Sequence, residues 1–203
     1  MKFSKIHCLV TGISVLLASC KTTQPFAEAD KSFIVSATAE TPFRVLLVTD
    51  RQDSVLLRKP CSDVKNFAAD STFQLLIARL KKTLEVENGV GIAATQVGIS
   101  KNLFLFMRLD LPDKPLHVAV NPRIVHHPDT TVCFERDGCL SIPERNGNSI
   151  RYPWIDVEYW NEKGEKIRER LEGYSRQHAF TAIIFQHEYD HTKGILFTDK
   201  LCK

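Results

Sequence analysis

The 203-residue sequence predicts an α+β fold, in which antiparallel sheets pack around a central helix near the C-terminus. Residues 155–159 and 167–171 alternate apolar and polar side chains around the turn sequence NEKG, a pattern typical of a β-hairpin. Residues 71–84 carry apolar side chains at helical spacing, and residues 179–191 form a second apolar helical run. Because strands precede this last helix, they are expected to pack around it.

The N-terminus predicts a leader peptide. Two lysines precede an apolar run at residues 6–18, which is short for a membrane span but suits a signal peptide. The run ends in LASC, which resembles the lipobox of bacterial lipoproteins. We expect residues 1–19 to be a lipoprotein-type signal peptide and Cys20 to carry the lipid. The alternatives are an ordinary hydrophobic leader or a misassigned start.

The remaining chain is expected to be a polar tether at residues 20–41 and one catalytic domain at residues 42–203. With 43% hydrophobic residues, this length can bury one good core. The net charge of +3 is small and unclustered, so no nucleic-acid partner is expected. Residues 45–48 suggest a short strand.

The elements between tether and final helix follow local signals. Ser71 and Gln74 form a capping-box signature for a helix that should end at Asn88-Gly89. Residues 103–107 read as a strand, and so do residues 117–120, which the turn pair NP should close. For the final helix, Ser175 is the expected N-cap and Gly194 lies just past the end.

The final helix carries the sequence QHEYDH, an HExxH motif. His187 and His191 are four residues apart, so both imidazoles lie on one helix face and can bind one metal ion. Glu188 would then lie beside the open coordination position, where a carboxylate can transfer a proton. The motif therefore predicts a catalytic metal site.

The third ligand is expected upstream of the motif. The position where metzincin proteases place a third histidine is Phe197, and no glutamate follows His191, which leaves Asp199 as a weak candidate. Upstream, Cys139 lies in the sequence DGCLS and can act as a thiolate ligand, although a buried cysteine is often only a small core residue. A third segment, GVGIAATQ at residues 89–96, suits a tight loop beside a substrate.

Together and in this order, the three motifs resemble the peptide deformylase family, which carries GxGxAAxQ, EGCLS and QHExDH. The resemblance extends over residues 45–197. It implies hydrolysis of N-formylmethionyl peptides or nascent proteins with release of formate. It also implies one divalent metal ion, iron(II) in most members, with zinc, nickel or cobalt possible. The implied roles are metal ligands for Cys139, His187 and His191, acid–base for Glu188, oxyanion stabilisation for Gln96 and the Leu140 N–H, and substrate contact at Gly91.

Two departures from the family pattern are expected to affect stability or tuning more than chemistry. Asp137 replaces the glutamate of EGCLS, and Thr192 replaces the leucine that commonly follows the last histidine. We expect Arg151 to form a structural ion pair with Asp137.

Two other functions remain open at this point. One is a metallopeptidase that cuts internal bonds with a different third ligand, such as Asp199. The other is a non-catalytic lipoprotein that binds formylated peptides. The leader predicts a membrane-anchored protein that faces out of the cytoplasm, whereas a misassigned start would leave the protein in the cytoplasm, where nascent chains are found.

The cysteine count predicts no regular disulfide framework. Cys8 would leave with the leader, while Cys20 and Cys139 have assigned roles. Cys61, Cys133 and Cys202 remain, which is an odd number.

Overall fold

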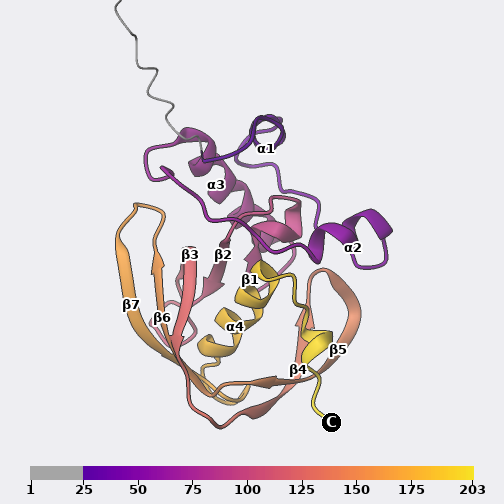
Figure 1. Ribbon diagram of the computed structural model, residues 1–203, viewed down its shortest axis with the longest axis vertical. Helices are drawn as coiled ribbons and strands as arrows, with labels where there is room; N and C mark the ends of the chain where they lie inside the picture. Colours follow the sequence, from indigo (N-terminus) through magenta and orange to yellow (C-terminus); the bar gives the residue numbers. More distant parts are fainter. Residues whose placement is uncertain (1–24) are drawn as a thin grey trace, which may run out of the picture.

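The computed structural model describes residues 25–203, and the predicted leader with Cys20 lies outside them. The fold is α+β, as predicted. Helix α4 (Thr181–Thr192) lies between a five-stranded antiparallel sheet and a two-stranded one (Figure 1). Among the described residues, no helix combines the length and hydropathy that a membrane span requires.

The larger sheet has the strand order β1-β2-β3-β6-β7. The predicted hairpin is confirmed, because β6 and β7 pair without a bulge from Trp154↔Glu172 to Trp160↔Lys166. In its turn, the Asn161 side chain accepts hydrogen bonds from two backbone N–H groups. The strand bounds are β1 Gly91–Ala93, β2 Leu103–Met107, β3 Leu116–His126, β6 Trp154–Trp160 and β7 Lys166–Glu172.

Strand β3 continues past the point where the sequence predicted its end, so that prediction was wrong. Asn121 has a φ of 51°, and the register shifts between Val120 and Arg123. The Asn121 side chain accepts from Val64 N at 2.7 Å and donates to Val64 O at 2.8 Å. This bulge accommodates the proline, which has no N–H to donate to a ladder, and the strand resumes beyond it.

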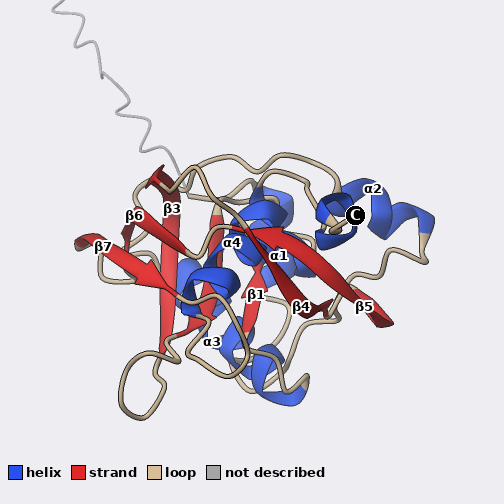
Figure 2. Cartoon of the chain, turned by 90° about the horizontal axis from the view of Figure 1, so that it is seen from below, coloured by secondary structure: helices blue, strands red, loops and turns tan. Residues whose placement is uncertain are grey.

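The second sheet consists of β4 (Val132–Cys139) and β5 (Ile142–Arg151), which the sequence did not predict as strands. It lies on the other side of α4 from strands β3, β6 and β7 (Figure 2). Its register shifts twice, and Cys139 pairs with Ile142 at the turn. Such bulges interrupt the alternation by which strands are recognised.

Helix α3 (Ser71–Val86) is confirmed, although its N-cap is not Ser71. The Asp70 carboxylate accepts the hydrogen bond from Phe73 N at 2.8 Å. At the other end, Asn88 takes the left-handed conformation with a φ of 51°, directly before Gly89. A tight turn therefore connects the helix to β1.

The expected tether is wrong for part of its length. Residues 28–34 form helix α1 (Glu28–Ile34), and Ile34 is fully buried against the core that includes α3. Residues 45–48 form no strand, but their backbone bonds to two other segments: Leu46 N donates to Gln96 O, and Val48 N donates to Ser141 O. Helix α2 (Arg51–Leu57) follows, with Asp50 as N-cap.

Helix α4 begins at Thr181, so the predicted N-cap at Ser175 is wrong; that hydroxyl bonds to His178 instead. The predicted end is confirmed, since Gly194 has a φ of +72° just beyond it. One face of α4 packs on the sheet, where Phe185 lies edge-on to Phe104 at 4.8 Å between ring centroids. Polar residues of the other face turn toward the β4–β5 sheet and are buried among neighbouring side chains.

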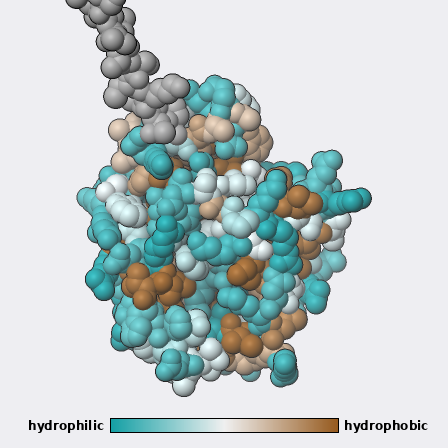
Figure 3. Space-filling model, viewed as in Figure 1, coloured by the Kyte–Doolittle hydropathy of each residue, from teal (hydrophilic) through white to brown (hydrophobic). Residues whose placement is uncertain are grey.

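A disulfide joins Cys133 in β4 to Cys202 at the chain end, while Cys61 is free. Within residues 25–203 this is one bond and not a framework, and Cys61 is the cysteine that the odd count leaves unpaired. The short 3-10 helix η2 (Phe197–Lys200) is thereby held against the β4–β5 sheet. The molecular face seen in Figure 3 is largely hydrophilic, with apolar residues in separate small areas.

Candidate active site

Three potential metal donors converge from two elements. Cys139 comes from the end of β4, and His187 and His191 come from the inward face of α4. Their donor atoms all lie within 4.8 Å of one another. The structure thus brings together the three residues that were expected to be metal ligands. Asp199, the alternative ligand, lies elsewhere and pairs with Arg58.

A buried carboxylate orients the first histidine. His187 Nδ1 lies 2.9 Å from Asp137 Oδ1. Burial alone would lower the pKa of His187, but the Asp137 carboxylate outweighs burial and raises that pKa well above its ordinary value. A metal ion would replace the proton on Nε2, while Nδ1–H stays donated to the carboxylate and fixes the ring.

The shorter side chain of Asp137 keeps a full set of partners. Its Oδ2 accepts from Ser149 Oγ at 2.6 Å and from Arg151 at 2.7 Å. Burial would raise the pKa of Asp137, yet His187 and Arg151 hold it well below the usual range. The expected ion pair between Arg151 and Asp137 is confirmed.

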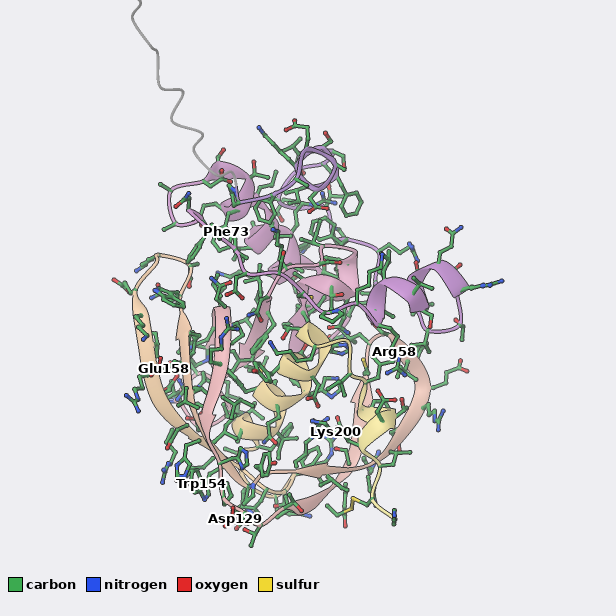
Figure 4. All side chains as sticks on the ribbon, in the orientation of Figure 1. Arg58, Phe73, Asp129, Trp154, Glu158 and Lys200 are labelled. Carbon is green, nitrogen blue, oxygen red and sulfur yellow. A yellow bond between two sulfur atoms is a disulfide. The ribbon has the colours of Figure 1, made fainter. Side chains whose placement is uncertain are left out.

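Arg151 extends this charge network to the C-terminal segment. Its side chain is 1% exposed and also pairs with Asp190 of α4 at 2.5 Å. The other oxygen of Asp190 accepts from Lys200 of η2 at 2.7 Å, and Figure 4 shows Lys200 near α4 and β5. Asp190 is the aspartate of the motif QHExDH, but the sequence predicted no role for it, nor for Ser149 or Lys200.

Gln96 is fixed beside the thiol. In the 3-10 helix η1 (Ala94–Val97) its side-chain oxygen accepts from Ala93 N at 2.8 Å, and the residue is 1% exposed. Its Nε2 lies 3.2 Å from Ser141 Oγ and 3.6 Å from Cys139 Sγ. An amide donor is therefore held within reach of any oxygen bound next to Cys139.

The residues present fit a metal ion. His191 Nε2 lies 3.2 Å from Cys139 Sγ, whereas its Nδ1 is buried without a hydrogen-bond partner in the described chain. Burial lowers the pKa of His191 well below its ordinary value, which favours the neutral imidazole that binds metals. One thiolate and two imidazoles are a donor set for a divalent transition metal.

Glu188 is a buried carboxyl group with one oxygen free to accept a hydrogen bond. The residue is 4% exposed, and its Oε2 has no hydrogen-bond partner among the described residues. Burial raises its pKa to about 7, so the group can both accept and release a proton near neutral pH. Gly91 makes room for it: a Cβ built there would lie 2.5 Å from Glu188 Oε1.

These groups open into a cavity of about 490 Å³. Gly91, Gln96 and Leu140 line it, together with Cys139 and the motif residues of α4. One part of the wall is apolar and is formed by Phe134, Phe180, Ile183 and Ile184. Phe134 was missed because β4 was not recognised as a strand.

The α+β fold, the three converging donors and the free buried carboxyl group define a metal-dependent hydrolase. The family model for polypeptide deformylase matches residues 45–203. The chain belongs to the polypeptide deformylase family.

Individual relatives agree with this assignment. A peptide deformylase of Thermotoga petrophila is 40% identical over 147 residues, which are 72% of this chain and 81% of the relative. A peptide deformylase of Chloroflexus aggregans is 32% identical over 170 residues, covering 78% and 86%. The crystal structure of peptide deformylase from Thermotoga maritima has a TM-score of 0.69 and 33% identity, covering 80% and 99%.

A further solved structure carries a ligand. The actinonin-bound class I type b peptide deformylase from Acinetobacter baumannii has a TM-score of 0.68 and 29% identity, over 80% of this chain and 99% of that one. The protein is accordingly a metal-dependent enzyme that removes the N-formyl group from formyl-methionyl peptides. Neither an internal-bond metallopeptidase nor a non-catalytic binder finds support in these comparisons.

Proposed function

We propose that Cys139, His187 and His191 hold one catalytic divalent ion and that Glu188 is the acid–base of formyl-amide hydrolysis. One observation carries this proposal. Glu188 lies beside the three converging donors, and within residues 25–203 its Oε2 has no hydrogen-bond partner. A bound divalent ion supplies a water of near-neutral pKa and polarises the formyl oxygen.

Glu188 handles the protons. With a pKa of about 7, its carboxylate accepts the proton of the attacking water and later delivers it to the departing amine. The products are formate and a peptide with a free N-terminus. An ion pair would lower the pKa of the carboxyl group and so make it a poor proton acceptor, and Glu188 has no such pair in the described structure.

Gln96 and the Leu140 N–H stabilise the charge that develops on the formyl oxygen. The Gln96 amide is held by Ala93 N–H and Ser141, so it needs no reorganisation during the reaction. Loss of one such donor typically costs about 3–4 kcal/mol of transition-state stabilisation. Gly91 lets the peptide lie against the loop beside Glu188.

The apolar wall receives the methionine side chain. Phe180, Ile183 and Ile184 come from the start of α4 and its preceding loop, and Phe134 comes from β4. A long, unbranched thioether fits an irregular apolar pocket well. For the ion we propose iron(II), with zinc, nickel or cobalt as possible substitutes, because a mixed thiolate and imidazole set suits these metals.

The experiment is release of formate by the metal-loaded chain, prepared without oxygen. We expect turnover of formyl-Met-Ala and none of acetyl-Met-Ala, which has an additional methyl group on the reacting carbonyl. Equal rates on both peptides, or cleavage of an internal bond, would contradict the proposed reaction.

We also propose that the protein is a lipoprotein that faces out of the cytoplasm, anchored through Cys20. The lipobox supports this. The Cys133–Cys202 disulfide supports it independently, because disulfides form and persist in oxidising compartments and are rare in the cytosol. The substrates would then be formylated peptides outside the cytoplasm.

Cell fractionation tests this location. We expect the wild-type chain in the membrane fraction and a Cys20→Ala variant to lose the lipid. Recovery of the wild type in the soluble cytoplasm with an intact Met1 would contradict the anchor.

A further inference from the structure

The cavity rim carries two arginines that the reaction described above does not use. Arg145 lies in β5, and Arg176 lies in the loop between β7 and α4; both line the cavity. Both residues are exposed, and within residues 25–203 no carboxylate forms an ion pair with either one. Of the described acidic residues that line the cavity, only Glu144 lies on the rim; the other two are buried.

Arg176 is held in place by backbone groups. Its guanidinium donates to Glu135 O at 3.2 Å and to Arg136 O at 2.5 Å. It also lies 5.2 Å from the ring centroid of Phe134 and 5.4 Å from that of Phe180. Because its partners are neutral carbonyls and rings, the positive charge is fixed beside the apolar wall without being neutralised.

Arg145 lies further along the same strand pair, toward the metal donors. Its neighbour Asn146 pairs with Gly138, which directly precedes Cys139. The two arginines therefore flank the stretch of β4 that runs from Glu135 to Gly138.

An extended peptide would bring its third residue to this rim. Successive residues rise about 3.3 Å and alternate sides, so the first and third side chains point the same way. With the formyl group at Cys139 and the first side chain against Phe180, the third residue lies about 7 Å further along, over the rim. The C-terminal carboxylate of a very short peptide reaches the same region.

We propose that Arg145 and Arg176 form a carboxylate-binding subsite that selects formyl peptides with a negative charge close to the methionine. This inference rests on the proposed function and names its substrate class. The carboxylate has two sources, an acidic side chain at the third residue or the free C-terminus of a short peptide. Guanidinium groups suit either one, since they bind carboxylates with paired hydrogen bonds.

The test compares matched peptides. Formyl-Met-Ala-Glu-amide and formyl-Met-Ala-Gln-amide differ in one charge, and formyl-Met-Ala-Ser with a free or amidated C-terminus tests the other source. At low salt we expect kcat/KM to favour the charged member of at least one pair by about 2- to 30-fold, the range for two exposed ion pairs. The preference should fall toward one in about 0.5 M salt.

Variants locate the effect. Arg145→Gln together with Arg176→Gln should abolish the preference, while the single Arg145→Gln, which leaves the Arg176 contacts intact, should reduce it. Arg51→Gln removes another exposed charge from α2, away from the cavity lining, and should leave the preference unchanged.

The outcomes are distinguishable. A preference within the Glu and Gln pair assigns the subsite to side chains, and one within the Ser pair assigns it to C-termini. Equal wild-type rates in both pairs, or a preference that survives the double substitution, would overturn the subsite while the deformylase function stands. Absence of formate from every peptide would overturn the function and the subsite together.

Discussion

The position of Gly91 gives the sharpest prediction about the acid–base group. An added Cβ would lie 2.5 Å from Glu188 Oε1 and 2.9 Å from Glu188 Cδ, where ordinary contacts begin at 3.4 Å. In a Gly91→Ala variant the carboxylate must therefore move by roughly 1 Å, and a misplacement of that size can cost about 10²-fold. Because the atoms that must yield belong to a side-chain end beside the cavity, we expect the fold to survive.

The assay is formate release with the bound metal measured in the same samples. We expect kcat of Gly91→Ala to fall by about 10²-fold, with one metal ion still bound and a near-normal melting temperature. Gly138→Ala is the matched control, because a Cβ there meets no heavy atom within 4 Å. It should retain kcat, and any effect should appear in KM. A Gly91→Ala variant within about threefold of wild-type kcat would refute the reasoning, because Glu188 would then tolerate displacement.

Three further predictions concern stability. Arg151→Met leaves two buried carboxylates without their shared cation, so the free energy of unfolding in urea should fall by about 3 kcal/mol; a loss below about 1 kcal/mol would contradict this. The hydrogen bond with Arg108 lowers the pKa of Asp110 from 3.8 to about 2, so its stabilisation is present above pH 4 and is lost as pH falls to 2. Asp110→Asn should cost about 1 kcal/mol or less at pH 7, since the group is partly exposed, and a deficit that persists undiminished down to pH 2 would exclude an ionic origin. Cys202→Ser should lower the free energy of unfolding by about 2–4 kcal/mol, and reduction of the Cys133–Cys202 bond in the wild type should have the same effect. A wild-type stability that does not change with reductant would contradict the disulfide.

The metal site was the most predictable part of the molecule. Helical geometry alone places two histidines four residues apart on one face, so the HExxH motif is sufficient to predict two of the ligands. The third ligand needed the family resemblance, because nothing local in DGCLS says that β4 ends against α4. Convergence of Cys139 with the histidines depends on long-range packing.

The failures have separate physical causes. Ser175 and Ser71 have the chemistry of N-caps, but α4 begins only at Thr181, and Asp70, an equally suitable cap, directly precedes Ser71 and caps α3. Residues 28–34 looked like tether because their polar residues outnumber the apolar ones, yet Ile34 alone supplies a fully buried anchor. Strands β4 and β5 are bulged, so no simple alternation marks them.

The number of cysteines does not show which of them form a disulfide. An odd number leaves open which residues meet in space, and the Cα atoms of Cys133 and Cys202 are 6.1 Å apart although 69 positions separate them in the sequence. The same packing brings Lys200 to Asp190 and completes the charge network behind His187.

Turnover of a Glu188→Gln variant loaded with metal tests the central claim most directly. The substitution keeps the side-chain shape and should leave all three metal donors in place, so we expect one equivalent of bound metal. Formate release should fall by about 10²- to 10⁴-fold, the contribution of a positioned acid–base group. A variant that binds metal normally and retains kcat within tenfold of wild type would contradict the proposed role of Glu188.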